Sequence, residues 1–328
     1  LMTEKMRVLF ALEMGGTVNA LKRSFGLLEE RGSEFKFAAS DVALSALQGM
    51  GRECVTAASD AGEVIGGFHP NVVVVGGSAF EQNHPKWTGL ELGYGLAAMD
   101  AGVPVVLYRD YSGVPKWSAQ LSDHPRSEEL LTLLMFDRMT AQVVQGRRAK
   151  RVAVVGSGFY DDLPDWDWLE ARRASRAKLG IGEDLVILLN AGADKDRVLE
   201  CLEPVVAGLL HLTGANVFFI PAFHPKDPDA PYGPGPTKGI WLPKPSASYD
   251  PVLARLEAVS SVRVIPEPVF RNAEPDSQRR MAAADLIVMN PASTETWTAV
   301  YGGIPQVVTA LPKTVAMLAE KGIEVEQF

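Results

Sequence analysis

The chain has 328 residues, a formal net charge of -8 and 47% hydrophobic residues. A hydrophobic core gains little beyond ~250 residues, so we expect two domains, each of which buries a core of its own. The acidic balance predicts no general attraction to nucleic acid, and the apolar content excludes an intrinsically disordered chain. No apolar run approaches the ~20 residues that span a bilayer, and the charged start of the chain is unlike a secretory signal. We therefore expect a cytoplasmic protein without a transmembrane segment.

Short apolar runs alternate with longer amphipathic stretches along the chain, which is typical of βαβ units around parallel sheets. In the first half, strands are expected at 7–12, 34–38, 53–57, 71–75 and 103–108. In the second half, they are expected at 151–155, 184–189, 216–220, 262–265, 285–289 and 306–308. The stretch 127–150 between the two series is rich in Leu and Met and is predicted to be helical. The domain boundary is therefore expected near residue 150, giving domains 1–150 and 151–328.

The segment 225–245 interrupts this alternation, because it contains seven prolines and three glycines. Loops without secondary structure that exceed ~12 to 15 residues are uncommon in compact domains. This segment is therefore predicted to be either a functional lid or a disordered insertion.

Three loops of the first half follow predicted strands, where the ligands of open α/β sheets bind. Gly15, Gly16 and Thr17 lie between the first strand and an amphipathic helix, so their backbone amides are candidates for binding an acceptor or a phosphate. His84 follows the fourth strand and Asp110 the fifth, and both are candidate general bases. Each of these residues also fits a structural role in a strand-to-helix turn.

The second half offers further loops after strands. Gly156 and Ser157 follow the strand expected at 151–155, and Gly192 precedes a helix. His224 and Lys226 close another strand, and this pair of potential cations suits an anionic ligand. With the helix start expected at 293–295, three helix N-termini lie in one half, which is what a diphosphate would need.

The stretch 281–305 reads as a helix end, an apolar strand, a turn, a helix start and a Gly-Gly-Ile-Pro sequence before the next strand. Ser293 and Thr294 are candidate caps of that helix, and Glu295 follows them directly. A purely structural capping role is the alternative.

This stretch resembles the donor-binding signature of GT-B glycosyltransferases and of non-hydrolysing UDP-N-acetylglucosamine 2-epimerases. The resemblance covers chiefly residues 150–312. It implies an α/β fold with two Rossmann-like domains facing each other across a cleft, the first binding the acceptor and the second a nucleotide-sugar donor. In the first half, Gly15-Gly16-Thr17 is similar to the opening of the peptidoglycan transferase of this group, with Val18-Asn19 in place of a glycine-histidine pair.

The resemblance also implies roles for single residues of the donor site. Gly156 to Asp161 would form the interdomain turn, and Gly192 would face the phosphates. Val269 and Phe270 would lie at the edge of the base. Ser293 to Glu295 would bind the diphosphate and the ribose.

One position departs from the family pattern. The glutamate that holds the ribose hydroxyls in these families stands seven residues before the proline, and Thr298 occupies that position here. Glu295 lies about one helical turn earlier, on the same face of the predicted helix. Either Glu295 replaces the missing carboxylate or the nucleotide differs from UDP.

We therefore expect a glycosyltransferase that uses a nucleotide-sugar donor and a small-molecule or glycan acceptor. Metal and other cofactors are expected to be dispensable, because helix N-termini with Lys226 or Arg271 can neutralise a leaving diphosphate. Two alternatives stay open: a sugar-nucleotide epimerase or hydrolase, and a nucleotide-sugar-binding protein without catalysis.

Overall fold

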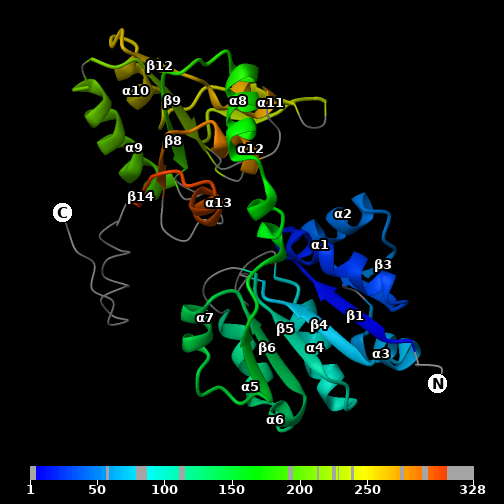
Figure 1. Cartoon of the computed structure of the whole chain (residues 1–328). Coiled ribbons are helices and arrows are strands. Elements are labelled where there is room, and N and C mark those ends of the chain that lie inside the picture. The colour runs from blue at the N-terminus through cyan, green and yellow to red at the C-terminus, as the bar shows by residue number, and fades with distance from the viewer. Residues whose placement is uncertain are drawn as a thin grey trace. The chain divides into compact units, whose positions relative to one another are not determined.

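The computed structural model describes residues 5–56, 59–78, 87–110, 115–190, 195–212, 214–223, 227, 229–237, 240–273, 277–289 and 295–308. Within these ranges, the side chains of residues 41, 139, 195, 197, 267, 295–297 and 308 are not described. The chain divides into two compact units, Leu1–Asp161 and Asp162–Phe328 (Figure 1). The division expected near residue 150 thus lies between Asp161 and Asp162.

The first unit contains a parallel sheet of seven strands in the order β3-β2-β1-β4-β5-β6-β7. Its strands are β1 (Arg7–Leu12), β2 (Glu34–Ala39), β3 (Cys54–Thr56), β4 (Val72–Gly76), β5 (Val105–Tyr108), β6 (Leu131–Met135) and β7 (Arg151–Val154). Its helices are α1 (Gly15–Glu30), α2 (Asp41–Gly49), α3 (Ala61–Phe68), α4 (Leu90–Asp100), α5 (Ala119–Asp123), α6 (Ser127–Leu130) and α7 (Arg138–Val143), with short 3-10 helices η1 (Lys116–Ser118) and η2 (Gly158–Tyr160).

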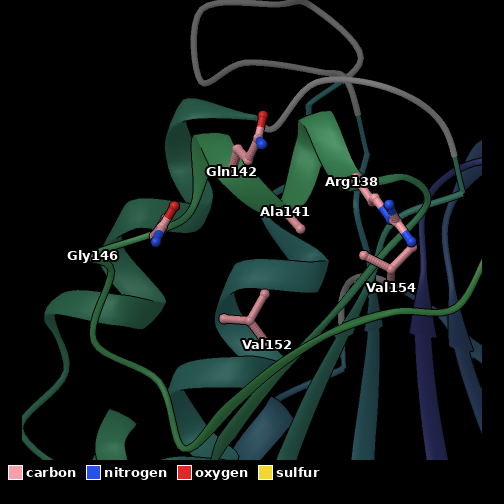
Figure 2. A pocket seen from close by; sticks show the side chains of 7 residues that line it. Arg138, Ala141, Gln142, Gly146, Val152 and Val154 are labelled. Atoms are coloured by element: carbon pink, nitrogen blue, oxygen red, sulfur yellow. The ribbon is translucent and has the colours of Figure 1, made fainter.

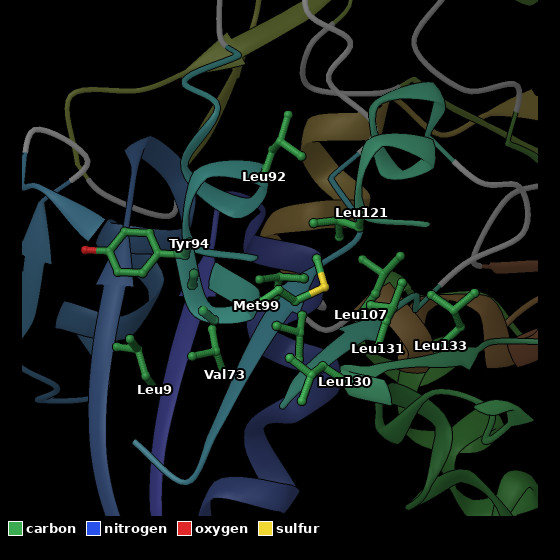
Figure 3. Close-up of a cluster of buried hydrophobic side chains, with 14 of the residues drawn as sticks. Leu9, Val73, Leu92, Tyr94, Met99, Leu107, Leu121, Leu130, Leu131 and Leu133 are labelled. Atoms are coloured by element: carbon green, nitrogen blue, oxygen red, sulfur yellow. The ribbon is translucent and has the colours of Figure 1, made fainter. Parts of the chain in front are cut away.

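Helices cover both faces of this sheet because side chains of a strand point alternately to either side. Leu9 and Ala11 of β1 join the cluster that packs under α3, α4 and α5. Val8, Phe10 and Leu12 of the same strand join the cluster under α1 and α2. Figure 3 shows the first cluster, in which Leu9 and Val73 of the sheet lie below Tyr94 and Met99 of α4.

The second unit contains a five-stranded parallel sheet in the order β12-β9-β8-β13-β14 and a separate two-stranded antiparallel sheet. Its strands are β8 (Leu185–Asn190), β9 (Val217–Ala222), β10 (Tyr232–Pro234), β11 (Trp241–Pro243), β12 (Val262–Val264), β13 (Leu286–Met289) and β14 (Gln306–Val308). Its helices are α8 (Trp168–Leu179), α9 (Lys195–Leu210), α10 (Asp250–Leu253), α11 (Glu267–Ala273), α12 (Ser277–Ala282) and α13 (Glu295–Tyr301), with 3-10 helices η3 (Leu163–Asp165) and η4 (Ala254–Leu256).

In the second unit, too, side chains of a strand point alternately to the two faces of the sheet and pack against different helices. Ile187 and Leu189 of β8 pack against α9, whereas Val186 and Leu188 pack towards α11, α12 and α13. Two Rossmann-like α/β units, each with a parallel sheet and helices on both faces, confirm the fold class expected from the sequence.

Three local predictions were wrong. The stretch 127–150 is not one helix, because β6 runs through it between α6 and α7. The strand at Arg151–Val154 pairs with β6 and so completes the first sheet, although we expected it to open the second domain. The proline-rich segment 225–245 contains the hairpin β10–β11, so it is not a loop without secondary structure, whereas its role as a lid stays a prediction.

Candidate functional site

The carboxyl edge of the first sheet is the candidate functional site. The strand order reverses between β1 and β4, and open α/β sheets bind ligands in the crevice beyond such a point. Buried polar side chains gather in the segments that follow these strands. We call Glu13, Thr17, Ser78, Glu91 and Asp110 the switch-point site, and each of them is at most 9% exposed.

Glu91 lies at the reversal point itself, although sequence analysis did not select it. The backbone N–H of Glu13 donates to its Oε1 at 2.9 Å, and the N–H of Ser78 donates to its Oε2 at 2.8 Å. One carboxyl group therefore bridges the segment after β1 and the segment after β4. Gly76 makes room for it, because a Cβ there would lie 2.4 Å from Glu91 Oε1.

The side chain of Glu13 in turn accepts hydrogen bonds at the start of α4, the helix that carries Glu91. Its Oε1 accepts the backbone N–H of Leu90 at 2.9 Å and the hydroxyl of Thr88 at 2.5 Å. Leu90 is the first residue of α4, and the preceding Gly89 has no side chain with which to cap the helix. Glu13 thus supplies the cap from a distant part of the chain. Its other oxygen, Oε2, is buried without a hydrogen-bond partner among the described residues.

Burial raises the pKa of Glu91 to about 8, and the nearby charges of Glu13 and Asp110 act in the same direction. The hydrogen bonds from the Ser78 and Glu13 amides oppose this shift in pKa without cancelling it. Two carboxylates that share a buried site resist ionising together, so one of them keeps its proton. Glu91 is therefore mostly protonated at neutral pH.

Asp110 lies at the N-terminus of α1. The hydroxyl of Thr17 donates to Asp110 Oδ1 in a long hydrogen bond of 3.4 Å, and a Cβ on Gly16 would lie 3.4 Å from Asp110 Oδ2. Burial raises the pKa of Asp110, although its own backbone amide, Arg109 and Thr17 lower it in part. Gly15, Gly16 and Thr17, predicted as a loop before the helix, form the first turn of α1. The structure brings this turn together with Asp110, which the sequence presented as a separate candidate.

Side chains from other parts of the first unit bind the backbone of Gly77 and Ser78, which follow β4. The indole N–H of Trp117 donates to the carbonyl oxygen of Ser78 at 3.1 Å, and a guanidinium N–H of Arg109 donates to the carbonyl oxygen of Gly77. A Cβ on Gly77 would lie 2.7 Å from Arg109 Cδ. His84, the other predicted base, lies farther along this segment and outside the described residues.

Gly156 and Ser157, which we predicted in the donor domain, lie in the first unit. Ser157 is buried, and its side chain hydrogen-bonds with Tyr108 at the end of β5. The next residue, Gly158, contacts α1 so closely that a Cβ would lie 2.3 Å from the carbonyl oxygen of Ala20. This turn therefore packs against the first sheet and α1.

The second sheet reverses its strand order between β8 and β13. Most candidates at that edge, Gly192, His224, Lys226, Ser293 and Thr294, lie outside the described residues. Glu295 is the first residue of α13, but its side chain also lies outside them. Thr298, at the position of the family glutamate, is buried, and its hydroxyl has no hydrogen-bond partner in the described part of the chain.

The three remaining donor-site candidates lie on α11 and differ in their surroundings. Val269 is 53% exposed, whereas Phe270 is buried in the core between the sheet and the helices. The guanidinium of Arg271 lies 5.4 Å from the ring centres of both Tyr232 and Trp241 in the hairpin, and it donates to the carbonyl oxygen of Phe223 at 3.1 Å. Arg271 thus ties the hairpin to the end of β9.

Two cavities lie away from these candidates. One, of about 420 Å³, lies between α7 and the exposed strand β7, where Val152 and Val154 face Arg138 and Gln142 (Figure 2). The other, of about 460 Å³, lies beyond β9 and β12 and is lined largely by prolines of the hairpin and the strand ends. None of the predicted site residues lines either cavity.

No described helix combines the length and apolar character that crossing a bilayer requires. Within the same ranges, no three or more His, Cys, Asp or Glu side chains are grouped so that they could hold a metal ion.

Comparisons with known proteins show similarity of structure. No family model and no curated protein matches the sequence. A glycosyltransferase of Rickettsia africae shares 10% identity at a TM-score of 0.58, covering 96% of this chain and 82% of that chain. The UDP-GlcNAc 2-epimerase of Neisseria meningitidis, solved with UDP-GlcNAc, shares 13% identity at a TM-score of 0.57, covering 95% and 85%. MurG of Acinetobacter baumannii shares 14% identity at a TM-score of 0.56, covering 97% and 84%. The chain therefore has the GT-B type of fold that glycosyltransferases and UDP-GlcNAc 2-epimerases share.

Proposed function

We propose that the protein is a glycosyltransferase that moves a sugar from a nucleotide-sugar donor to a hydroxyl group of an acceptor. The observation that carries the proposal is Asp110, a buried carboxylate of raised pKa at the carboxyl edge of the first sheet of a GT-B fold. A general base works best when its pKa approaches the working pH, and partial desolvation moves a carboxylate in that direction. His84, which follows the neighbouring strand β4, is the alternative base.

The proposed step inverts the configuration of the transferred sugar. The base, Asp110 or His84, takes the proton of the acceptor hydroxyl, whose oxygen forms a bond to the anomeric carbon. The bond from that carbon to the diphosphate breaks, and the nucleoside diphosphate leaves with the electron pair. The second unit would bind the donor through Gly192 and Ser293 to Glu295. Lys226 or Arg271 would balance the charge of the leaving group without a metal ion.

Turnover of a panel of nucleotide-sugars by the full chain tests the proposal, with product analysis of donor, acceptor and sugar. We expect transfer to an acceptor, and we expect it to persist in excess EDTA. An isomerised donor would replace the proposal by a sugar-nucleotide epimerase, and free sugar without acceptor product would indicate a hydrolase. Tight donor binding without any product would point to a binding protein. Absence of both binding and turnover across the panel would refute a nucleotide-sugar function.

A further inference from the structure

We propose that Glu91 is a positioning residue for the reaction described above: its carboxyl group holds the ends of β1 and β4 together and thereby fixes the place of Asp110. The role in the reaction rests on the proposed function, whereas the clamp itself is a property of the fold. Glu91 touches no reacting group in this scheme, so it acts through the backbone that it binds.

The first support is the position of Glu91 between two strands that are adjacent in space and distant in sequence. It accepts the N–H of Glu13, 78 residues away, and the N–H of Ser78. At a point of strand reversal, the segments after the two strands separate to follow helices on different faces. A side chain that binds both amides sets the distance between these segments.

The second support is a continuous line of contacts from Glu91 to Asp110. Gly76 packs against Glu91, and a Cβ there would also lie 3.3 Å from Cγ2 of Thr17. The hydroxyl of Thr17 in turn donates to Asp110. A shift of the β4 end would therefore move Thr17 and with it the partner of the proposed base.

The third support is that the clamp is reciprocal. Glu91 binds the backbone of Glu13, and Glu13 caps α4, the helix that carries Glu91. Loss of either side chain removes a short hydrogen bond from a buried backbone N–H group, which is costly. The exposed Glu63, in the first turn of α3, has no such role and provides a matched control.

The charged groups around Glu91 make the clamp sensitive to pH. Glu13 approaches from the segment after β1 and Asp110 from the end of β5, while Arg109 binds the Gly77 carbonyl. The fold raises the pKa of Glu91 from the ordinary 4.5 to about 8, so the folded state favours the protonated carboxyl. Stability linked to this group is present at low pH and is lost as the pH rises from the ordinary value through about 8.

The test compares wild-type protein with Glu91→Gln and Glu63→Gln, using the full chain. The amide nitrogen of glutamine cannot accept an N–H, so the amide of Glu13 or of Ser78 should exchange with solvent about tenfold faster or more. We expect kcat to fall by roughly 100-fold, the cost typical of a small misplacement in an active site, with the donor KM unchanged. The decline of Tm between about pH 4.5 and pH 8, where the stability linked to Glu91 is lost, should also flatten. Glu63→Gln should leave all three measurements as in wild type.

Unchanged exchange of both amides in folded Glu91→Gln would overturn the clamp. Faster exchange with unchanged kcat would overturn the positioning role. If Glu91→Gln does not fold, the carboxyl carbon of Glu91 is titrated by NMR in the wild-type protein, and titration near the ordinary pKa would refute the buried clamp. Absence of turnover by wild-type protein would overturn the proposed function and this role in it, while amide exchange would still decide the clamp.

Discussion

The chemistry of the switch-point site depends on how the surroundings of single residues differ. Asp110 accepts a hydrogen bond from Thr17 at the start of α1, where the helix dipole favours a negative charge. Glu91 is more deeply buried and lies beside Glu13, so its pKa rises to about 8. The two carboxyl groups therefore suit different tasks: Asp110 can serve as a base, and protonated Glu91 can hold backbone segments together.

Replacing Asp110 by asparagine keeps the shape and removes the base. We expect turnover at saturating donor to fall by ~100 to 10,000-fold, while donor binding stays nearly intact. Because burial raises the pKa of Asp110, the wild-type rate should rise with pH through a value above the ordinary 3.8. His84→Ala is the matched comparison. If neither variant slows turnover that much, the inverting mechanism with a base from the first unit is wrong.

Glu295 stays the predicted ribose contact of the second unit. Replacing it by glutamine weakens a charge-assisted hydrogen bond worth about 1.5 to 3 kcal/mol, so donor affinity should fall more than tenfold in a calorimetric titration. Glu170→Gln, an exposed carboxylate in the first turn of α8, is the control and should leave affinity unchanged. Equal affinities for Glu295→Gln and wild type would mean that Glu295 only begins a helix.

At the scale of elements, an ion network fixes α8 to the amino-terminal ends of β8 and β13. Asp285 accepts the N–H of Val186 at 2.8 Å and pairs with Arg172 and Arg176. Arg176 also donates to the carbonyl oxygen of Ala283 at 3.0 Å. The network lies at the opposite edge of the sheet from the predicted donor loops, so its role is structural.

Asp285→Asn should lower the free energy of unfolding by about 2 kcal/mol, because charge-assisted hydrogen bonds to two arginines are lost. Burial alone would raise the pKa of Asp285, but the Val186 amide and the two arginines lower it below the ordinary 3.8. The stabilisation is therefore present above that value and is lost as the pH falls through the lower folded pKa.

Denaturant unfolding at neutral and acidic pH measures this effect. The exposed pair of Arg255 and Glu203 provides the control, and Glu203→Gln should cost less than about 1 kcal/mol. Equal effects of the two substitutions at neutral pH would show that the Asp285 network adds no more than a surface pair.

At the scale of the whole molecule, the chain repeats one architecture, since both units contain a parallel sheet with helices on both faces. In each sheet the order of strands reverses once beside the first strand, so each unit provides one crevice where loops converge. Two such crevices suit a reaction with two substrates.

Binding of the donor should stabilise the full chain. A ligand present at 100 times its dissociation constant adds roughly 2.7 kcal/mol to the free energy of unfolding, which a thermal-shift screen detects. We expect nucleoside diphosphates and nucleotide-sugars to raise Tm, and the corresponding free sugars to leave it unchanged. A uniform response to all these compounds would argue against a nucleotide site.

The sequence determined the α/β class and most strands, because burial on both faces makes the parallel strands short apolar runs. The prediction from sequence failed at two consecutive strands, β6 and β7. The run at Leu131–Met135 is predicted to be helical but forms β6, since a short buried strand and a buried helical turn share the same apolar pattern. Arg151–Val154 is a strand as predicted, but it belongs to the first sheet and not to the second, because its partner β6 is not apparent from the sequence.

The sequence also selected Asp110 and Gly15-Gly16-Thr17, because polar residues after strands and glycines near the start of a helix are local signals. Glu91 is not among the residues predicted from the sequence, although it is the charged residue within the otherwise apolar stretch 90–99 of α4. Its bonds to Glu13 and Ser78 join segments that only the order β1-β4 brings together. Only tertiary structure decided this part of the site, because strand order depends on which sheet edges the connecting helices can reach and not on any local pattern.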